Sequence, residues 1–233
     1  TDWADNRAKI PQDVIRKTLG KDFDGLYSTS ERDRFRTRLE RSADGSTEVY
    51  ITHRGMQEVY TSAQKDQTIW QPRPSDPELE TEFLRRLMVK LGVSQEQADA
   101  VAKANTTTAA ATGSVRMESA NGQPVLQIDE GFDRAWRRVG VALDRTGFTV
   151  EDRDRSRGIY FVRYVAPDAK VEPKGFFSKL FSRSPDAAAP VKYQIQVRSE
   201  GDKSTVTVLN TQGQPETSAN AQRIVRVITD DMK

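Results

Sequence analysis

The second half of the chain carries the clearest hydrophobic pattern. Phe132, Trp136, Val139 and Leu143 follow one another at helical spacing, which predicts a helix with Trp136 at the centre of its buried face. Residues 191–198 alternate strictly between apolar and polar types, as in a strand with one face on a core and the other in water.

Shorter apolar runs complete the pattern of this half. They occupy residues 125–128, 148–150, 159–165 and 206–209, and an apolar stripe follows Ser218. The runs predict short strands, and the stripe predicts a final helix. The predicted order is strand, helix, four strands, helix. Because a short antiparallel sheet cannot bury its apolar face alone, the helices are expected to cover it.

The first half predicts a hairpin followed by a helix. Residues 34–53 form two strand-like stretches that turn at Asp44-Gly45. Apolar residues recur every four positions over 77–91, after Asp76 as a candidate N-cap. Between them the first half inserts a longer segment, residues 56–76, that the second half lacks.

The two halves align without a gap at an offset of 158 residues (191 minus 33), so that Asp33–Gly55 lies over Val191–Gly213. Matched positions include Phe35 with Tyr193 and Leu39 with Val197. We interpret the match as two copies of one hairpin in tandem domains; the alternative is chance recurrence of hairpins of similar length. At this offset the chain begins inside the pattern, so the first copy is expected to lack its opening strand, helix and strand.

These patterns predict an α+β protein with two domains, each an antiparallel sheet packed on a long helix. The expected domains are residues 1–92 and 123–233. Residues 93–122 are expected to be a flexible linker, because 105–122 is rich in Thr, Ala, Ser and Gly. A weak polar helix from Ser94 is possible within this range.

Composition narrows the function classes. Lys and Arg number 36 against 34 Asp and Glu, so no strong basic field favours nucleic acid. The absence of Cys excludes thiolate nucleophiles, Cys-based zinc sites and disulfides. No stretch approaches the roughly 18 consecutive apolar residues that a membrane-spanning helix needs.

The side chains nominate no catalytic or metal site. His53 is the single histidine, and we interpret it as a structural or solvated residue rather than a metal ligand. Glu151, Asp152 and Asp154 are interleaved with arginines, which favours a solvated turn over a cation site. We find no phosphate-binding glycine loop and no nucleophile elbow. The sequence therefore predicts no enzyme, no cofactor and no metal.

Two surface features remain as candidates for binding. Arg32, Arg34, Arg36 and Arg38 fall on one face of a predicted strand, where a water-facing role is favoured over an anionic partner. The segment 173–183 is amphipathic and lies in a Pro- and Ala-rich insertion. Its apolar side chains either dock on their own domain or contact a partner. The candidate partner-binding residues are Phe176, Phe177, Leu180 and Phe181.

Several of these stretches together resemble one known family. They are Thr1-Asp2-Trp3, the run Phe83-Leu84-Arg85-Arg86-Leu87, the Thr/Ala-rich linker, and the second domain from Val125 through Trp136 to Gly147. The chain resembles the BamC (NlpB) family, which are outer-membrane lipoproteins of the β-barrel assembly machinery.

The resemblance implies two tandem helix-grip domains and a non-enzymatic accessory role among other subunits of the assembly complex. It implies a Gram-negative outer-membrane location through a lipidated N-terminal segment that this sequence is expected to lack. The family supplies no functional residue that maps onto a numbered position here. A runner-up function is a carrier that holds a small apolar ligand between helix and sheet, but filled packing around Phe132 and Trp136 is the expectation.

Overall fold

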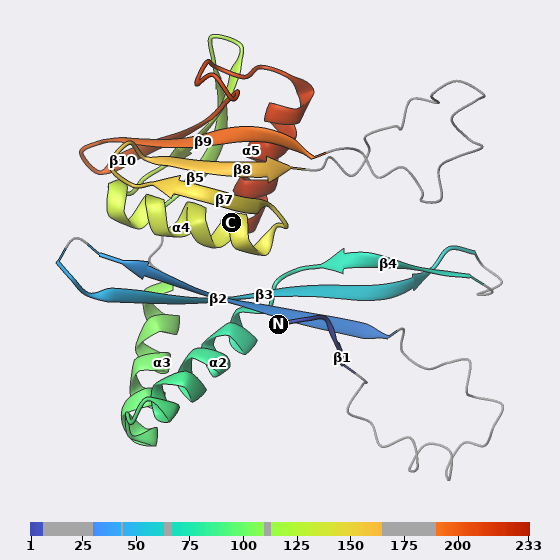
Figure 1. Ribbon diagram of the computed structural model, residues 1–233, viewed down its shortest axis with the longest axis vertical. Coiled ribbons are helices and arrows are strands. Elements are labelled where there is room, and N and C mark those ends of the chain that lie inside the picture. Colours follow the sequence, from blue (N-terminus) through green and yellow to red (C-terminus); the bar gives the residue numbers. More distant parts are fainter. Residues whose placement is uncertain (7–29, 43, 63–66, 110–112, 165–189) are drawn as a thin grey trace. The chain divides into compact units, whose positions relative to one another are not determined.

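The computed structural model describes residues 1–6, 30–42, 44–62, 67–109, 113–164 and 190–233. The chain divides into two compact units, Thr1–Ala110 and Ala111–Lys233. Among the described residues, each unit combines an antiparallel sheet with two helices (Figure 1). The predicted α+β class with antiparallel sheets is thus confirmed.

The first unit is built on a four-stranded sheet in the order β1-β2-β3-β4. The strands are β1 (Ala4–Asn6), β2 (Glu31–Arg41), β3 (Thr47–Tyr60) and β4 (Thr68–Arg73), and the helices are α2 (Pro77–Lys90) and α3 (Gln95–Ala109). Helix α2 packs on β3, and α3 packs on α2 (Figure 1). The rings of Phe35 and Phe83 stack with centroids 4.0 Å apart, which places the inner face of β2 against α2.

The start of α2 follows its sequence signals. The Asp76 carboxylate accepts hydrogen bonds from the backbone N–H groups of Glu78 and Leu79, and Pro77 occupies the first helical turn. This cap satisfies two of the backbone donors that a helix leaves unpaired at its N-terminus. The predicted N-cap and the predicted helix are both confirmed.

The second unit is a six-stranded sheet in the order β5-β6-β10-β9-β8-β7, with α4 and α5 on one face (Figure 1). The strands are β5 (Val115–Ala120), β6 (Gln123–Ile128), β7 (Thr149–Asp154), β8 (Ile159–Tyr164), β9 (Val191–Glu200) and β10 (Lys203–Leu209); the helices are α4 (Phe132–Arg145) and α5 (Ala219–Asp231). The order from β6 to α5 is the predicted one.

The main apolar core lies between the second sheet and its two helices. Trp136 has no exposed surface, as predicted, and stacks on Tyr160 with centroids 3.9 Å apart. The Tyr160 hydroxyl donates to the backbone carbonyl of Trp136 at 2.8 Å. The strictly alternating strand β9 directs Tyr193, Ile195 and Val197 into this core.

The expected linker is wrong over most of its length. The alternative helix from Ser94 is confirmed: α3 begins after Ser94, whose hydroxyl accepts from the Gln97 N–H. Ala98 on this helix is completely buried. Strand β5 then pairs with β6 through a two-residue turn at Asn121-Gly122, where both φ angles are positive. Asn-Gly is strongly preferred in such a turn, so this residue pair, within a stretch rich in small residues, indicates a hairpin. The inserted segment 56–76 holds the end of β3 and all of β4.

The gapless match between the two hairpins also needs correction. Hairpin β2–β3 leaves five residues in its turn and β9–β10 leaves two, so the strand pairing shifts by one residue. Leu39 pairs with Val49 and is 67% exposed, whereas its match Val197 pairs with Val206 and is 2% exposed. Leu39 nevertheless lies on the same face of β2 as Phe35, and Val197 on the same face of β9 as Tyr193, because each pair is four residues apart along its strand. The matched positions therefore share the inner face, and Leu39 differs from Val197 because it is left uncovered in the first unit.

Candidate functional site

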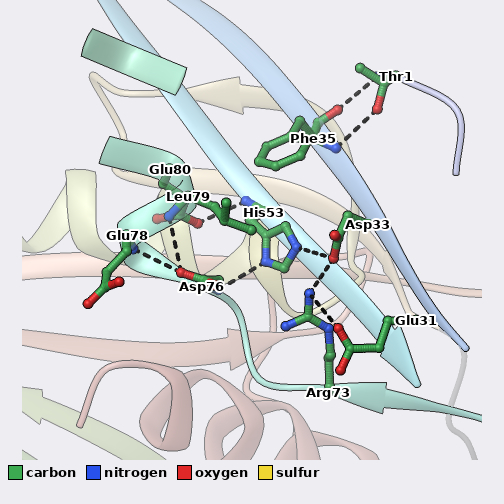
Figure 2. Close-up of polar contacts among 10 residues, drawn as sticks. All are labelled: Thr1, Glu31, Asp33, Phe35, His53, Arg73, Asp76, Glu78, Leu79 and Glu80. Atoms are coloured by element: carbon green, nitrogen blue, oxygen red, sulfur yellow. Dashed lines mark hydrogen bonds and ion pairs between the residues drawn. The ribbon is translucent and has the colours of Figure 1, made fainter. Parts of the chain in front are cut away.

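A buried group of polar side chains joins the first sheet to helix α2. We call it the His53 cluster; its members are Asp33 on β2, His53 on β3, Arg73 at the end of β4, and Asp76 and Glu80 at the start of α2 (Figure 2). His53 is fully buried, and Asp33 and Glu80 are 8% and 7% exposed. Burial of this many ionisable groups is costly unless each finds a partner.

Both ring nitrogens and the backbone N–H of His53 have partners within the cluster. Its Nδ1 accepts the Asp76 backbone N–H at 2.9 Å, and its Nε2 lies 2.8 Å from the Asp33 carboxylate. Because Nδ1 accepts a hydrogen bond, the imidazole proton sits on Nε2 and is donated to Asp33. The backbone N–H of His53 donates to the Glu80 carboxylate at 2.8 Å.

This arrangement fixes the position of a helix rather than activating a reactant. A histidine that acts as a general base needs one ring nitrogen facing the reacting atom. In His53 both nitrogens are occupied, one by the amide that opens α2 and one by Asp33 (Figure 2). His53 is therefore a structural residue, one of the two roles predicted for it; the solvated role is wrong, since the ring is inaccessible.

Arg73 completes the cluster, and it fits there because Gly55 on the neighbouring strand has no side chain. One Arg73 guanidinium nitrogen pairs with the Asp33 carboxylate, and Glu31 lies 3.9 Å away. Arg73 stands opposite Gly55 in the ladder between β3 and β4, and a Cβ at Gly55 would lie 2.4 Å from Arg73 Nε. Burial raises the pKa of Asp33, but the hydrogen bonds from His53 and Arg73 outweigh it, so the pKa is below its ordinary value.

The second unit offers a hollow surface instead. The face of its sheet opposite to α4 and α5 carries a groove over β6, β10 and β9, with a volume of about 640 Å³. We call it the open-face groove. Gln127, Gln196, Thr205 and Thr207 form its floor, and Arg198 and Lys203 are among the charged residues that line it. A floor of amides and hydroxyls offers both donors and acceptors to a polar segment.

A neighbouring hollow of about 350 Å³ lies over β7, β8 and β9, where Phe161 contributes an apolar surface. Beside it, Glu151 pairs with Arg163 at 2.8 Å and with Lys192 at 3.0 Å. Asp154 pairs with Arg157 at 2.6 Å. The predicted neutralisation by the intervening arginines holds for Arg157 on Asp154, but Arg155 pairs with Asp133 and the cations that pair with Glu151 come from β8 and β9.

The space between helix and sheet in the second unit is occupied by the protein's own side chains. Trp136 is packed between Phe132, with ring centroids 5.7 Å apart, and Tyr160. The neighbouring Val139 and Leu143 have no exposed surface. The filled packing expected here is confirmed, and the arrangement does not favour an apolar ligand carrier.

The other residues predicted as binding candidates do not meet in one site. Phe176, Phe177, Leu180 and Phe181 lie outside the described residues. Arg32, Arg34, Arg36 and Arg38 lie on the face of β2 directed away from α2, in agreement with their period of two. The water-facing role favoured for them is wrong for Arg38, which is buried, pairs with Glu40 and lies over the ring of Tyr50. Within the part of the chain that the structure describes, no group of three or more His, Cys, Asp or Glu residues is arranged to hold a metal ion.

Comparison with known proteins gives matches along the whole chain. Residues 1–105 match the model of the outer membrane protein assembly factor BamC-like N-terminal domain, and residues 114–232 match that of the C-terminal domain. The chain is 54% identical to outer membrane protein assembly factor BamC of Thiobacillus denitrificans and 51% identical to that of Accumulibacter regalis. Both alignments cover 100% of this chain, which spans 64% and 62% of the two relatives.

Proposed function

Because this chain belongs to the BamC family of outer membrane protein assembly factors, we propose that it is a non-catalytic accessory subunit of the complex that assembles β-barrel proteins in the outer membrane. In this proposal it acts through contacts with the other subunits. The observation that carries the proposal is the match of both family domains, in order, over residues 1–105 and 114–232.

The geometry of the His53 cluster supports a role without catalysis. Its only histidine uses both ring nitrogens to hold α2 against the sheet. The carboxylates of Asp33 and Glu80 accept hydrogen bonds from protein groups and are almost fully buried. A substrate would have to displace the start of a helix to reach them, so this cluster supports stability rather than turnover.

Two surfaces are proposed as contact sites. The open-face groove is the more concrete, because its Gln and Thr side chains present hydrogen-bonding groups on a rigid sheet. The segment with Phe176, Phe177, Leu180 and Phe181 is proposed from its sequence alone. Its test is replacement of the three phenylalanines by Ser, which should weaken capture of partner subunits while leaving the fold intact.

Location at the outer membrane follows from the family, and anchoring by a lipid attached outside this sequence is part of the proposal. Among the described residues, no helix is both long enough and apolar enough to cross a membrane. Attachment through a lipid requires no such helix.

In-cell photo-crosslinking tests the groove as a contact surface. A photoreactive residue is placed at Gln196 or Thr205 in the groove, and at Arg226 on the exposed side of α5 as a control. The groove positions should crosslink to another subunit of the assembly complex, and Arg226 should not. Failure of the chain to co-purify with any such subunit would refute the proposed function. Crosslinks from Arg226 but not from the groove would refute the choice of surface.

A further inference from the structure

The outer face of the first sheet, directed away from α2, contains two arginines in direct opposition. The ladder between β2 and β3 pairs Arg34 with Arg54. Like charges directly opposite each other on antiparallel strands destabilise the sheet. A Glu at either position would convert the repulsion into an attraction, so the pair is unfavourable for the isolated fold.

Neither guanidinium has a carboxylate partner among the described residues. Arg34 donates through Nε to the backbone carbonyl of Thr1 at 3.1 Å, and Arg54 lies 6.0 Å from the ring centroid of Trp3. Arg54 is half-buried, and this burial together with the charge of Arg34 lowers its pKa. Both effects disfavour the cation. An anion placed between the two side chains would relieve the repulsion and offset the cost of burial by its attraction to both guanidinium groups.

The neighbouring Arg32 shows what a satisfied arginine looks like on the same face. Its Nε donates to the Asp5 carboxylate at 2.6 Å, and its guanidinium lies 4.2 Å above the ring of Trp70. The strand therefore neutralises and stacks one arginine while the next one along this face has no such partner. This difference indicates that Arg34 and Arg54 can receive a negative charge supplied from outside the described residues.

We propose that Arg34 and Arg54, with Trp3 beside them, bind a carboxylate side chain of an acidic segment of a partner protein. Guanidinium groups hold carboxylates through paired, charge-assisted hydrogen bonds. Trp3 is 38% exposed, and Trp with Arg is the combination enriched at protein interfaces.

The surroundings favour a narrow acidic group over an anionic membrane. Asp5 and Glu58 lie on the same face of the sheet, beside the arginines. A plane of lipid phosphates would place negative charge against these carboxylates as well as against the arginines. A single acidic side chain reaches the arginine pair alone. This inference does not depend on the proposed assembly function.

The experiment measures binding of a labelled acidic peptide to the full chain by fluorescence anisotropy. The probe is a decapeptide in which Glu alternates with Ser, and the matched probe has Gln in place of every Glu. The wild-type chain should bind the Glu peptide about tenfold more tightly than the Gln peptide. Arg34→Gln and Arg54→Gln should each reduce affinity for the Glu peptide about tenfold.

The control is Arg226→Gln, which removes the same charge from an exposed position on α5 and should leave binding unchanged. Equal binding of the two peptides, no binding at about 1 mM peptide, or equal loss in Arg226→Gln would overturn the proposal. A further outcome would also overturn it: the chain binds vesicles of equal parts phosphatidylglycerol and phosphatidylcholine, this binding requires both arginines, and the Glu peptide does not bind. If a variant fails to fold, comparison of the two peptides on the wild-type chain decides.

Discussion

Replacement of Asp33 by Asn removes one charge from the His53 cluster while keeping its shape. In the wild-type protein, one Asp33 oxygen accepts hydrogen bonds from His53 and from Arg73. A hydrogen bond that involves a charged group contributes about 1.5–3 kcal/mol, against about 0.5–1.5 kcal/mol for a neutral pair. Each of the two bonds should therefore lose about 1 kcal/mol, and the first unit should lose about 2 kcal/mol of unfolding free energy.

Because the chain divides into two compact units, the assay must report on each one. Hydrogen–deuterium exchange with mass spectrometry does so through peptides from β3 and from β9–β10. In Asp33→Asn, amides of β3 and of the first turns of α2 should exchange about 30-fold faster, the factor that corresponds to about 2 kcal/mol. Amides of β9 and β10 should keep their wild-type rates.

The matched control is Asp202→Asn, which removes the same charge from an exposed turn of the second unit. It should change exchange in neither β3 nor α2. The reasoning about the His53 cluster is refuted if Asp33→Asn leaves exchange in β3 unchanged. It is also refuted if both units lose protection equally, since the effect would then not arise from the cluster.

Four further outcomes follow from the same contacts. Gly55→Ala should displace Arg73 and cost about 1–2 kcal/mol in urea unfolding of the first unit, an effect that Arg73→Ala should largely abolish. Acid should lower the unfolding free energy of the first unit. The Asp33 carboxylate stabilises this unit fully above its ordinary pKa of 3.8, and this stabilisation is lost as the pH falls through the lower pKa that Asp33 has in the folded protein. Asp33→Asn should remove this pH dependence. Trp136→Ala should destabilise the second unit by about 3–5 kcal/mol in urea unfolding. Ser204→Ala should cost about 1–3 kcal/mol by the same measurement, because the fully buried Ser204 hydroxyl donates to the backbone carbonyl of the buried Glu130, which would lose this donor.

The second unit was the more predictable from sequence, for a physical reason. Its stability rests on apolar side chains, whose spacing in the sequence repeats the geometry of the helix and the strand. Trp136 and the alternating residues of β9 could be placed in the core for that reason. The missed strand β5 carries no such pattern, since five of its six residues are exposed. Its signal was the turn Asn121-Gly122, which a reading of composition alone treats as part of a linker.

The His53 cluster was harder to predict because its members come from three strands and a helix. No local spacing brings Arg73 to Asp33; the meeting depends on the pairing of β4 with β3 and on the missing side chain at Gly55. One signal was present. Alternation along β2 places Asp33 on the same face as Phe35, the face turned toward the helix, and a carboxylate there requires a partner. His53 lies directly opposite Phe35 in the ladder, so the hairpin register alone brings it close to Asp33.

The two units therefore differ in how they tolerate change. An apolar core accepts substitutions that conserve volume, one residue at a time, at a cost of less than about 1.5 kcal/mol each. A buried ion pair does not, because removal of one partner leaves the other charge without compensation. His53 and Arg73 both donate to the same carboxylate oxygen of Asp33. Loss of any one of the three therefore changes the environment of the other two. We therefore expect these three positions to change together among related chains, whereas residues around Trp136 should vary independently within the apolar types.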